Sequence, residues 1–124
     1  MSRSKSFEDL EVFQLAERLC DFVWEIVSQW TYFDKDTIGK QMVRASDSIG
    51  ANIVEGIGRW NYQDNKRFIR IARGSLYETK FWLRRAYQRN LLKDEDISKL
   101  KNIIDELLPK LNAYHNSIGQ PPGH

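Results

Sequence analysis

The sequence predicts an all-α protein that folds as an antiparallel, up-down-up-down four-helix bundle. Apolar residues recur at steps of three and four along four long stretches, which is the periodicity of amphipathic helices. Short polar segments separate these stretches, and no stretch alternates apolar and polar residues as a strand does. Only three prolines occur, and two of them lie near the C-terminus. We therefore expect one bundle domain over residues 1–118 and a flexible tail over residues 119–124.

The first helix is expected over about residues 8–30. Ser6 and Asp9 have the spacing of a capping box, which favours a helix start there. The positions expected to face inward are Leu10, Phe13, Ala16, Leu19 or Cys20, Val23, Ile26 or Val27, and Trp30. The segment TYFDKD then interrupts the pattern and offers two candidate N-caps for the next helix, Asp34 and Asp36.

The second and third helices are expected over about residues 36–59 and 62–90. Asn61 is a favourable N-cap for the third helix. The second helix has an inward face made of Ile38, Met42, Ala45, Ile49, Ile53 and either Gly56 or Ile57. The third helix has a corresponding stripe made of Phe68, Ala72, Ser75, Thr79, Leu83 and Ala86.

The fourth helix has the most regular apolar pattern, and Asn90 and Asp94 mark the turn before it. Its steps alternate between three and four along Ile97, Leu100, Ile104, Leu107, Leu111, Tyr114 and Ile118. Pro109 falls inside this pattern. We expect it to kink the helix or to leave the Asp105 carbonyl without its usual backbone donor.

Polar residues follow one edge of the apolar face of the second helix. At 100° per residue they cluster together, and Ser75 lies in a small-residue segment of the third helix that would meet them. An unpaired polar group at such a contact costs about 1–3 kcal/mol, so we expect hydrogen bonds to the third helix or to another subunit. We call these residues the polar seam: Gln41, Ser48, Asn52, Glu55, Arg59 and Ser75.

An enzyme with Glu55 as general base is the alternative interpretation of this row. The row contains no histidine, no cysteine and no second acid, and the chain has only two histidines, His115 and His124. Neither a catalytic pair nor a set of metal ligands follows from such residues. We therefore expect no catalytic residue, metal, cofactor or small-molecule substrate.

Charge is segregated between two of the helices. The first carries six carboxylates against Arg18, a net charge of −5, and the third carries eight cations against Asp64 and Glu78, a net charge of +6. Within the third helix, one narrow sector about 27 Å long holds five cations and a tyrosine. We call this set the basic stripe: Lys66, Arg70, Arg73, Tyr77, Lys80 and Arg84.

A basic line with an aromatic residue can follow a phosphate backbone, with Tyr77 stacking on a base. Two other interpretations remain open. The stripe can face the acidic first helix of the same bundle or of a neighbouring subunit, or it can be an ordinary solvated face. The sequence pI near 8.7 is below the strongly basic range that is typical of nucleic-acid-binding domains.

Aromatic residues exceed what a slim bundle interior can hold, which favours a homo-oligomer. The surplus consists of Trp24, Trp30, Tyr32, Trp60, Phe81 and Trp82. Cys20 lies among apolar residues and is expected to be a small buried hydrophobe rather than a reactive thiol. With no apolar run long enough for a membrane span and no secretory pattern, we expect a cytoplasmic protein without a membrane partner.

Three segments resemble a known family: FEDLEVFQLAERL, QMVRASDSIGANIVEGIGR and KRFIRIARGSLYET. They are similar to the bacterial 23S rRNA intervening-sequence proteins, over about residues 7–115. The matching positions are Gln41, Arg44, Ala45, Ser48, Asn52, Glu55 and Gly56, followed by Ala72, Gly74, Ser75, Leu76 and Glu78. Val54 and the TYFDKDTIGK segment depart from the family pattern.

This resemblance implies an antiparallel four-helix bundle and a homopentameric ring. The family is in turn similar to accessory variability proteins of retroelements, which bind a reverse transcriptase and nucleic acid. Together with the residues, the resemblance leads us to expect a non-enzymatic, oligomeric bundle. Its basic stripe would bind structured RNA or an RNA–protein partner, and the alternative is a scaffold that binds protein or itself.

Overall fold

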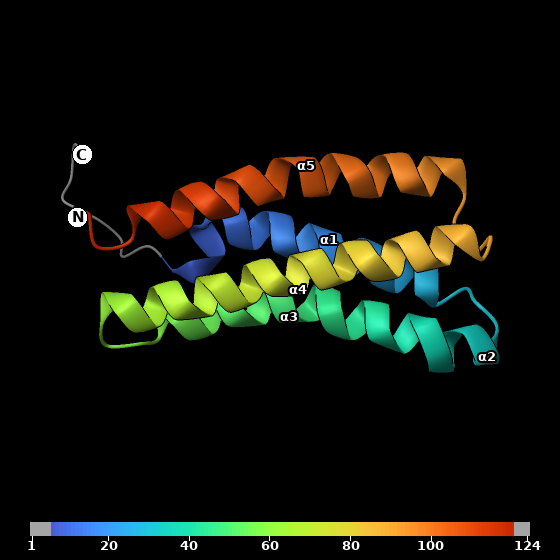
Figure 1. Cartoon of the computed structure of the whole chain (residues 1–124), viewed down its shortest axis with the longest axis horizontal. Helices are drawn as coiled ribbons and strands as arrows, with labels where there is room; N and C mark the ends of the chain where they lie inside the picture. The colour runs from blue at the N-terminus through green and yellow to red at the C-terminus, as the bar shows by residue number, and fades with distance from the viewer. Residues whose placement is uncertain (1–5, 121–124) are drawn as a thin grey trace.

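The computed structural model describes residues 6–120 and confirms the all-α four-helix bundle (Figure 1). Its four long helices are α1 (Glu11–Val27), α3 (Lys40–Ile57), α4 (Tyr62–Gln88) and α5 (Asp94–Ser117). They run along one axis, and the chain reverses direction at each connection (Figure 1). No helix among the described residues combines the length and the apolar character that crossing a bilayer requires.

The first helix is shorter than predicted at both ends. A 3₁₀ turn, Phe7–Asp9, precedes α1, and the Ser6 backbone N–H donates to Asp9 Oδ2 at 3.1 Å. The C-terminal end of α1 is Val27, so Trp30 lies beyond the helix. Its indole packs against the core, and Nε1 donates to the Leu91 carbonyl at 3.2 Å.

The predicted break at TYFDKD is wrong, because a helix already begins inside it. The short helix α2 (Tyr32–Asp34) continues through a π-helical turn, Lys35–Gly39, into α3. Its cap is neither Asp34 nor Asp36: Thr31 Oγ1 accepts the Asp34 backbone N–H at 3.4 Å. A threonine with extended backbone before a helix has the geometry of an N-cap.

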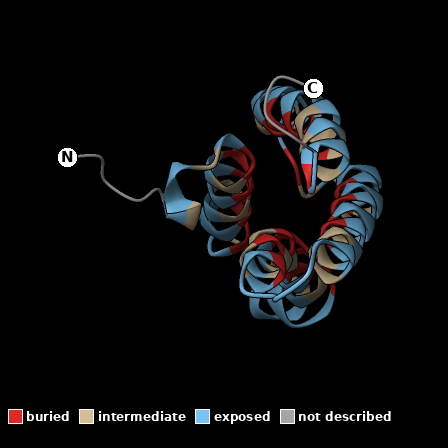
Figure 2. Cartoon of the chain, turned by 90° about the vertical axis from the view of Figure 1, so that its left-hand side faces the viewer, coloured by how far each residue is buried: buried red, intermediate tan, exposed pale blue. Residues whose placement is uncertain are grey.

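The four long helices follow one another around a common core, so that each contacts the helices before and after it. α3 packs on α1 and α4, and α5 packs on α4 and α1. Figure 2 shows the buried side of each helix turned toward the bundle axis. The largest fully buried side chains come from all four helices: Leu19, Met42, Ile49, Ile53, Ile69, Leu76, Leu100, Leu107 and Leu111.

Four members of the stripe predicted for α4 are buried, namely Ala72, Thr79, Leu83 and Ala86, and the inward face also includes two residues outside that stripe. Ile69 and Leu76 are buried, whereas Phe68 and Ser75 are half-buried. The two aliphatic side chains occupy the centre of the core. Ser75 therefore lies at the edge of the core, in contact with α3.

Helix α5 continues through Pro109 and does not end there. Since proline has no N–H, the Asp105 carbonyl lacks the backbone bond that residue 109 would otherwise donate. Leu107 and Leu111 are fully buried on either side of the proline and hold the helix on the core. The predicted tail lies mostly on residues 121–124, outside the described residues.

Candidate nucleic-acid interface along α4 and α5

The polar seam has one bond that crosses between helices. The Ser48 and Ser75 hydroxyl oxygens lie 2.8 Å apart, joining α3 to α4. Asn52 Nδ2 donates to the Ser48 carbonyl at 2.8 Å and lies 3.0 Å from the Ser48 hydroxyl. These half-buried groups therefore satisfy one another at the helix contact, as a structural role requires.

The rest of the seam does not bond across to α4. Gln41 is half-buried, and exposed Glu55 forms an ion pair with Arg59, which lies two residues beyond the end of α3. The Arg59 guanidinium lies 4.6 Å from the centre of the Phe68 ring on α4. Arg59 thus contacts α4 through an aromatic ring rather than through a hydrogen bond.

The backbone next to Glu55 packs closely against α4, although the Glu55 side chain itself is exposed. A Cβ added to Gly56 would lie 2.6 Å from Asn65 Oδ1 and 3.1 Å from Phe68 Cβ. The backbones of α3 and α4 therefore approach each other at this glycine, and the space is filled. The role of Gly56 is to permit this approach.

The basic stripe lies on the side of α4 that faces α5. Arg70, Arg73, Tyr77, Lys80 and Arg84 are exposed, and Lys66 is half-buried. Two hollows lie between α4 and α5, and residues of the stripe form one wall of each. Arg70 and Arg73 line a hollow of about 130 Å³, while Lys80 and Arg84 line a larger groove of about 330 Å³.

Tyr77 lies between these two pairs of cations. The Arg73 guanidinium is 5.3 Å, and the Lys80 ammonium 5.2 Å, from the centre of its ring. Both distances are within the range of cation–π attraction. The ring of Tyr77 therefore contacts both of its basic neighbours, and base stacking by this exposed tyrosine stays a prediction.

The cations of the stripe have no carboxylate partner among the described residues. The ion pairs in that part of the chain are Asp36–Lys40, Glu55–Arg59, Asp64–Arg67 and those of Lys110 with Glu11 and Glu106. The polar contact made by the stripe is instead between Arg70 Nη1 and His115 Nε2, at 3.2 Å. Acidic α1 packs on α3 and α5, so the stripe does not face it within this chain.

The α5 side of this interface includes residues that periodicity along α4 does not predict. On α5, Lys101 lines the larger hollow and His115 lines the smaller one, both opposite the stripe. Tyr87 of α4 also lines the larger hollow. Tyr87 continues the spacing of the stripe beyond Arg84, a signal that the sequence does contain. Lys101 and His115 carry no such signal, because only the packing of α5 on α4 brings them there.

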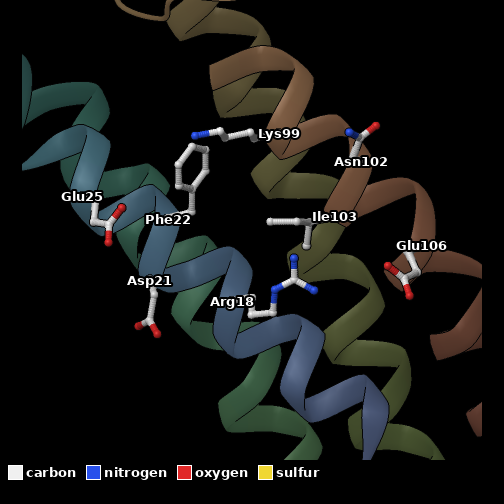
Figure 3. A pocket seen from close by; sticks show the side chains of 8 residues that line it. All are labelled: Arg18, Asp21, Phe22, Glu25, Lys99, Asn102, Ile103 and Glu106. Atoms are coloured by element: carbon white, nitrogen blue, oxygen red, sulfur yellow. The ribbon is translucent and has the colours of Figure 1, made fainter. Parts of the chain in front are cut away.

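A third hollow, of about 500 Å³, lies between α1 and α5. Phe22 and Ile103 extend into it, whereas Asp21 points away from it (Figure 3). Lys99 Nζ is 5.5 Å from the centre of the Phe22 ring. Its charged groups come from both helices and have mixed signs: Arg18, Asp21, Glu25, Lys99 and Glu106.

The surplus aromatic residues divide into two groups. Trp30 and Trp82 are half-buried and pack against the core. The other four are exposed: Trp24 to 63%, Tyr32 to 80%, Phe81 to 52% and Trp60 completely. This chain alone therefore leaves a large aromatic surface uncovered.

The remaining reactive groups are few. Cys20 is half-buried, and burial, with smaller contributions from Asp47 and Asp21, raises the pKa of its thiol to about 12. The thiol is therefore protonated and weakly nucleophilic at neutral pH. Within residues 6–120, no three His, Cys, Asp or Glu side chains gather as metal ligands would.

Comparison with known proteins agrees with this architecture. A protein of unknown function from the S23 ribosomal protein family of Bacteroides thetaiotaomicron has a similar structure. The TM-score is 0.74 at 21% identity, and the match covers 84% of this chain and 97% of that one. No curated protein matches the chain. The model of the 23S rRNA-intervening sequence protein family matches residues 8–113, and the chain belongs to this family.

Proposed function

We propose that this protein is a non-enzymatic, oligomeric bundle that binds structured RNA, alone or together with an RNA-bound protein, through the basic stripe. The observation that carries the proposal is the set of exposed cations, Arg70, Arg73, Lys80 and Arg84, without a carboxylate partner among the described residues. Cations that stabilise a bundle are expected to be paired, as Lys110 is with Glu11 and Glu106.

The spacing of the stripe supports a phosphate ligand. The four cations lie on one side of a straight helix, over about 21 Å from Arg70 to Arg84. Arginine forms forked hydrogen bonds that match phosphate oxygens, and three of the four are arginines. A repeating anion along a backbone fits such a line better than a single small anion does.

The exposed aromatic residues support the oligomeric part of the proposal. Gly74, in the middle of α4, has no atom within 4 Å of the position of an added Cβ. A glycine there costs about 1 kcal/mol of helix stability without serving any close contact inside the chain. Close approach of a second copy to α4 explains both Gly74 and its exposed neighbours Ile71 and Phe81. The family resemblance makes a pentameric ring the expected form.

The position of Glu55 supports the non-enzymatic part of the proposal. A general base needs a hollow in which a substrate can reach it. Glu55 instead pairs with Arg59 on the outer side of α3, beside the close contact at Gly56. A cytoplasmic location, where RNA is available and Cys20 stays reduced, belongs to the same proposal.

The alternative is a scaffold without a nucleic-acid role. It is favoured by the exposed acidic residues of α1, which include Glu17, Asp21 and Glu25 at one-turn intervals. The basic stripe of one copy would then meet the acidic helix of the next, in the head-to-tail manner that generates rings. The same cations cannot serve both partners at once, so the two functions are experimentally separable.

The test is binding of a structured, fluorescently labelled RNA to the full chain across a range of salt concentrations. Replacing Arg73 and Lys80 together by alanine is expected to weaken binding and to reduce the slope of log affinity against log salt by roughly 1.4–1.8, for two lost phosphate contacts. The matched control replaces Arg67 on α4 and Arg89 directly after its end, both outside the stripe, and should retain the slope. If the stripe variant instead dissociates the oligomer, the alternative function as a scaffold is correct.

A further inference from the structure

The larger groove between α4 and α5 combines an apolar floor with a basic rim. Leu83, Leu92, Leu100 and Ile104 form the floor and are nine-tenths or more buried. The groove measures about 330 Å³, near the lower limit of roughly 300 Å³ for small-ligand pockets. It is therefore large enough for a flat ring and too small for an extensive protein surface.

Charge on the rim favours an anionic ligand. Lys80 and Arg84 stand on the α4 side, and Lys101 stands on the α5 side. One acid, Asp105, also lines the groove, so the lining carries a net charge of +2 from three cations and one carboxylate. An apolar cavity that is edged by cations suits a molecule with a flat apolar ring attached to phosphate.

Tyr87 supplies an available aromatic face at the same place. Its side chain lines the groove and is 51% exposed. Tyr77 differs, because Arg73 and Lys80 lie over its ring, whereas no such cation lies over Tyr87 within residues 6–120. A ring without a cation partner is free to stack on another flat group.

We propose that this groove holds an unstacked nucleobase, with Tyr87 stacking on it while Lys80, Arg84 and Lys101 bind the flanking phosphates. This inference rests on the proposed function and specifies it: the ligand is an unpaired segment of RNA, not a regular duplex. Proteins that read RNA commonly do so at single-stranded loops, where bases can turn out and stack on aromatic side chains. In a duplex the bases are paired inside the helix and cannot enter the groove.

The geometry also gives the path of the RNA along the bundle. Arg70 and Arg73, at the smaller hollow, precede Lys80 and Arg84 by about ten residues, or roughly 15 Å along α4. A strand with one base in the larger groove would therefore extend along the stripe toward His115, which bonds Arg70. The stripe then positions the backbone, and the groove selects the unpaired state.

The experiment compares an oligouridylate with an RNA duplex of the same length, using fluorescence anisotropy of the full chain. The oligouridylate is expected to bind on the order of tenfold more tightly than the duplex. Replacing Tyr87 by alanine should remove this preference and leave duplex binding and the salt slope unchanged. Tyr87→Phe is the matched control and should retain the preference, because it keeps the ring.

A second variant, Ile97→Trp, fills the groove without altering any charge. It should likewise lower oligouridylate binding alone, with far-UV circular dichroism used to confirm that the bundle is intact. Equal binding of both RNAs that neither variant changes would overturn the groove and leave the stripe standing. Absence of binding to either RNA at low salt would overturn the proposed function and the groove together. A change of oligomeric mass in Tyr87→Ala would instead assign the groove to a subunit contact.

Discussion

The hydroxyl groups of Ser48 and Ser75 form the one side-chain hydrogen bond of the polar seam that joins α3 to α4, with 2.8 Å between their oxygens. Both side chains are half-buried, and Asn52 donates to Ser48 from one turn away. A pair of small hydroxyls lets two helices approach closely while leaving neither polar group unsatisfied. The contact therefore sets the relative position of the two helices along their length.

Removing both partners of this pair should cost less than the sum of the two single changes. Ser48→Ala or Ser75→Ala leaves a hydroxyl without its partner, and we expect each to lower the free energy of unfolding by about 1–2 kcal/mol. The double variant should lose less than the sum of the two, because no orphaned hydroxyl remains. Urea unfolding of the four proteins in this cycle measures the coupling. Strict additivity would show that the two hydroxyls act independently.

Gly56 and Gly74 should respond to alanine in opposite directions. At Gly56 the new Cβ would lie 2.6 Å from Asn65 Oδ1 and 3.1 Å from the Asn65 carbonyl oxygen. We expect Gly56→Ala to destabilise the fold by about 1–3 kcal/mol, because α3 and α4 must separate.

Gly74→Ala is the matched comparison on the adjacent helix. Nothing lies within 4 Å of its added Cβ, so alanine should stabilise the isolated bundle by about 1 kcal/mol through helix propensity. Chemical denaturation at low protein concentration reports both values. Equal destabilisation by the two variants would contradict the difference in packing. A loss of oligomer in Gly74→Ala alone would place a second chain at this glycine.

The Trp30 indole should couple the end of α1 to the turn between α4 and α5. Its Nε1–H donates to the Leu91 carbonyl at 3.2 Å, and the ring packs on the core. Trp30→Phe retains most of the apolar burial but loses the donor, which should cost about 1–1.5 kcal/mol. Thermal unfolding measures the loss. Trp60→Phe is the control, because Trp60 is fully exposed and its replacement should leave the transition unchanged.

The fold class follows from the sequence because the capping residues of α4 and the apolar periodicity of α5 both agree with the observed packing. Asn61 does cap α4: its Oδ1 accepts the Asp64 backbone N–H at 2.8 Å. The regular 3,4 pattern of α5 overrides the proline within it, since burial on both sides outweighs one missing backbone bond. Asn90, with φ of 61°, ends α4 in the left-handed conformation that asparagine tolerates.

The start of the second helix could not be predicted from capping preferences alone. Thr31, Asp34 and Asp36 are all acceptable N-caps. The position of this segment beside α1 also depends on Gly39, whose added Cβ would lie only 2.7 Å from Val27 Cγ1. That contact is tertiary, so no local pattern reports it.

The candidate site was predicted only in part for a similar reason. Periodicity places the six members of the basic stripe on one side of a helix, because 100° per residue is a property of the helix itself. Which helix faces that side depends on the order of packing around the core. The groove, and with it Lys101 and the apolar floor, becomes visible only once α5 is placed against α4.

The Cys20 thiol should be slow to react in the folded protein. Burial is the main cause of its raised pKa of about 12, against an ordinary value of 9.0. At pH 8 the thiolate is therefore scarce in the folded chain, and alkylation by iodoacetamide should be much slower than that of a free thiol. Rates should rise to that of a free thiol in denaturing urea. Rapid alkylation in native buffer would show that the pKa of the thiol is not raised.

The same shift predicts how Cys20 affects stability with pH. Its folded pKa lies above its unfolded pKa, so the folded state retains the proton more strongly. The stabilisation is fully present below about pH 9 and is lost as the pH rises through 9 toward 12, where the unfolded chain alone ionises. The difference in free energy of unfolding between the native protein and Cys20→Ala should therefore shift against the native protein over this range. Because every other ionisable group is the same in both proteins, its effect cancels in this difference. A difference that stays constant from pH 8 to pH 11 would contradict a thiol that folding keeps protonated.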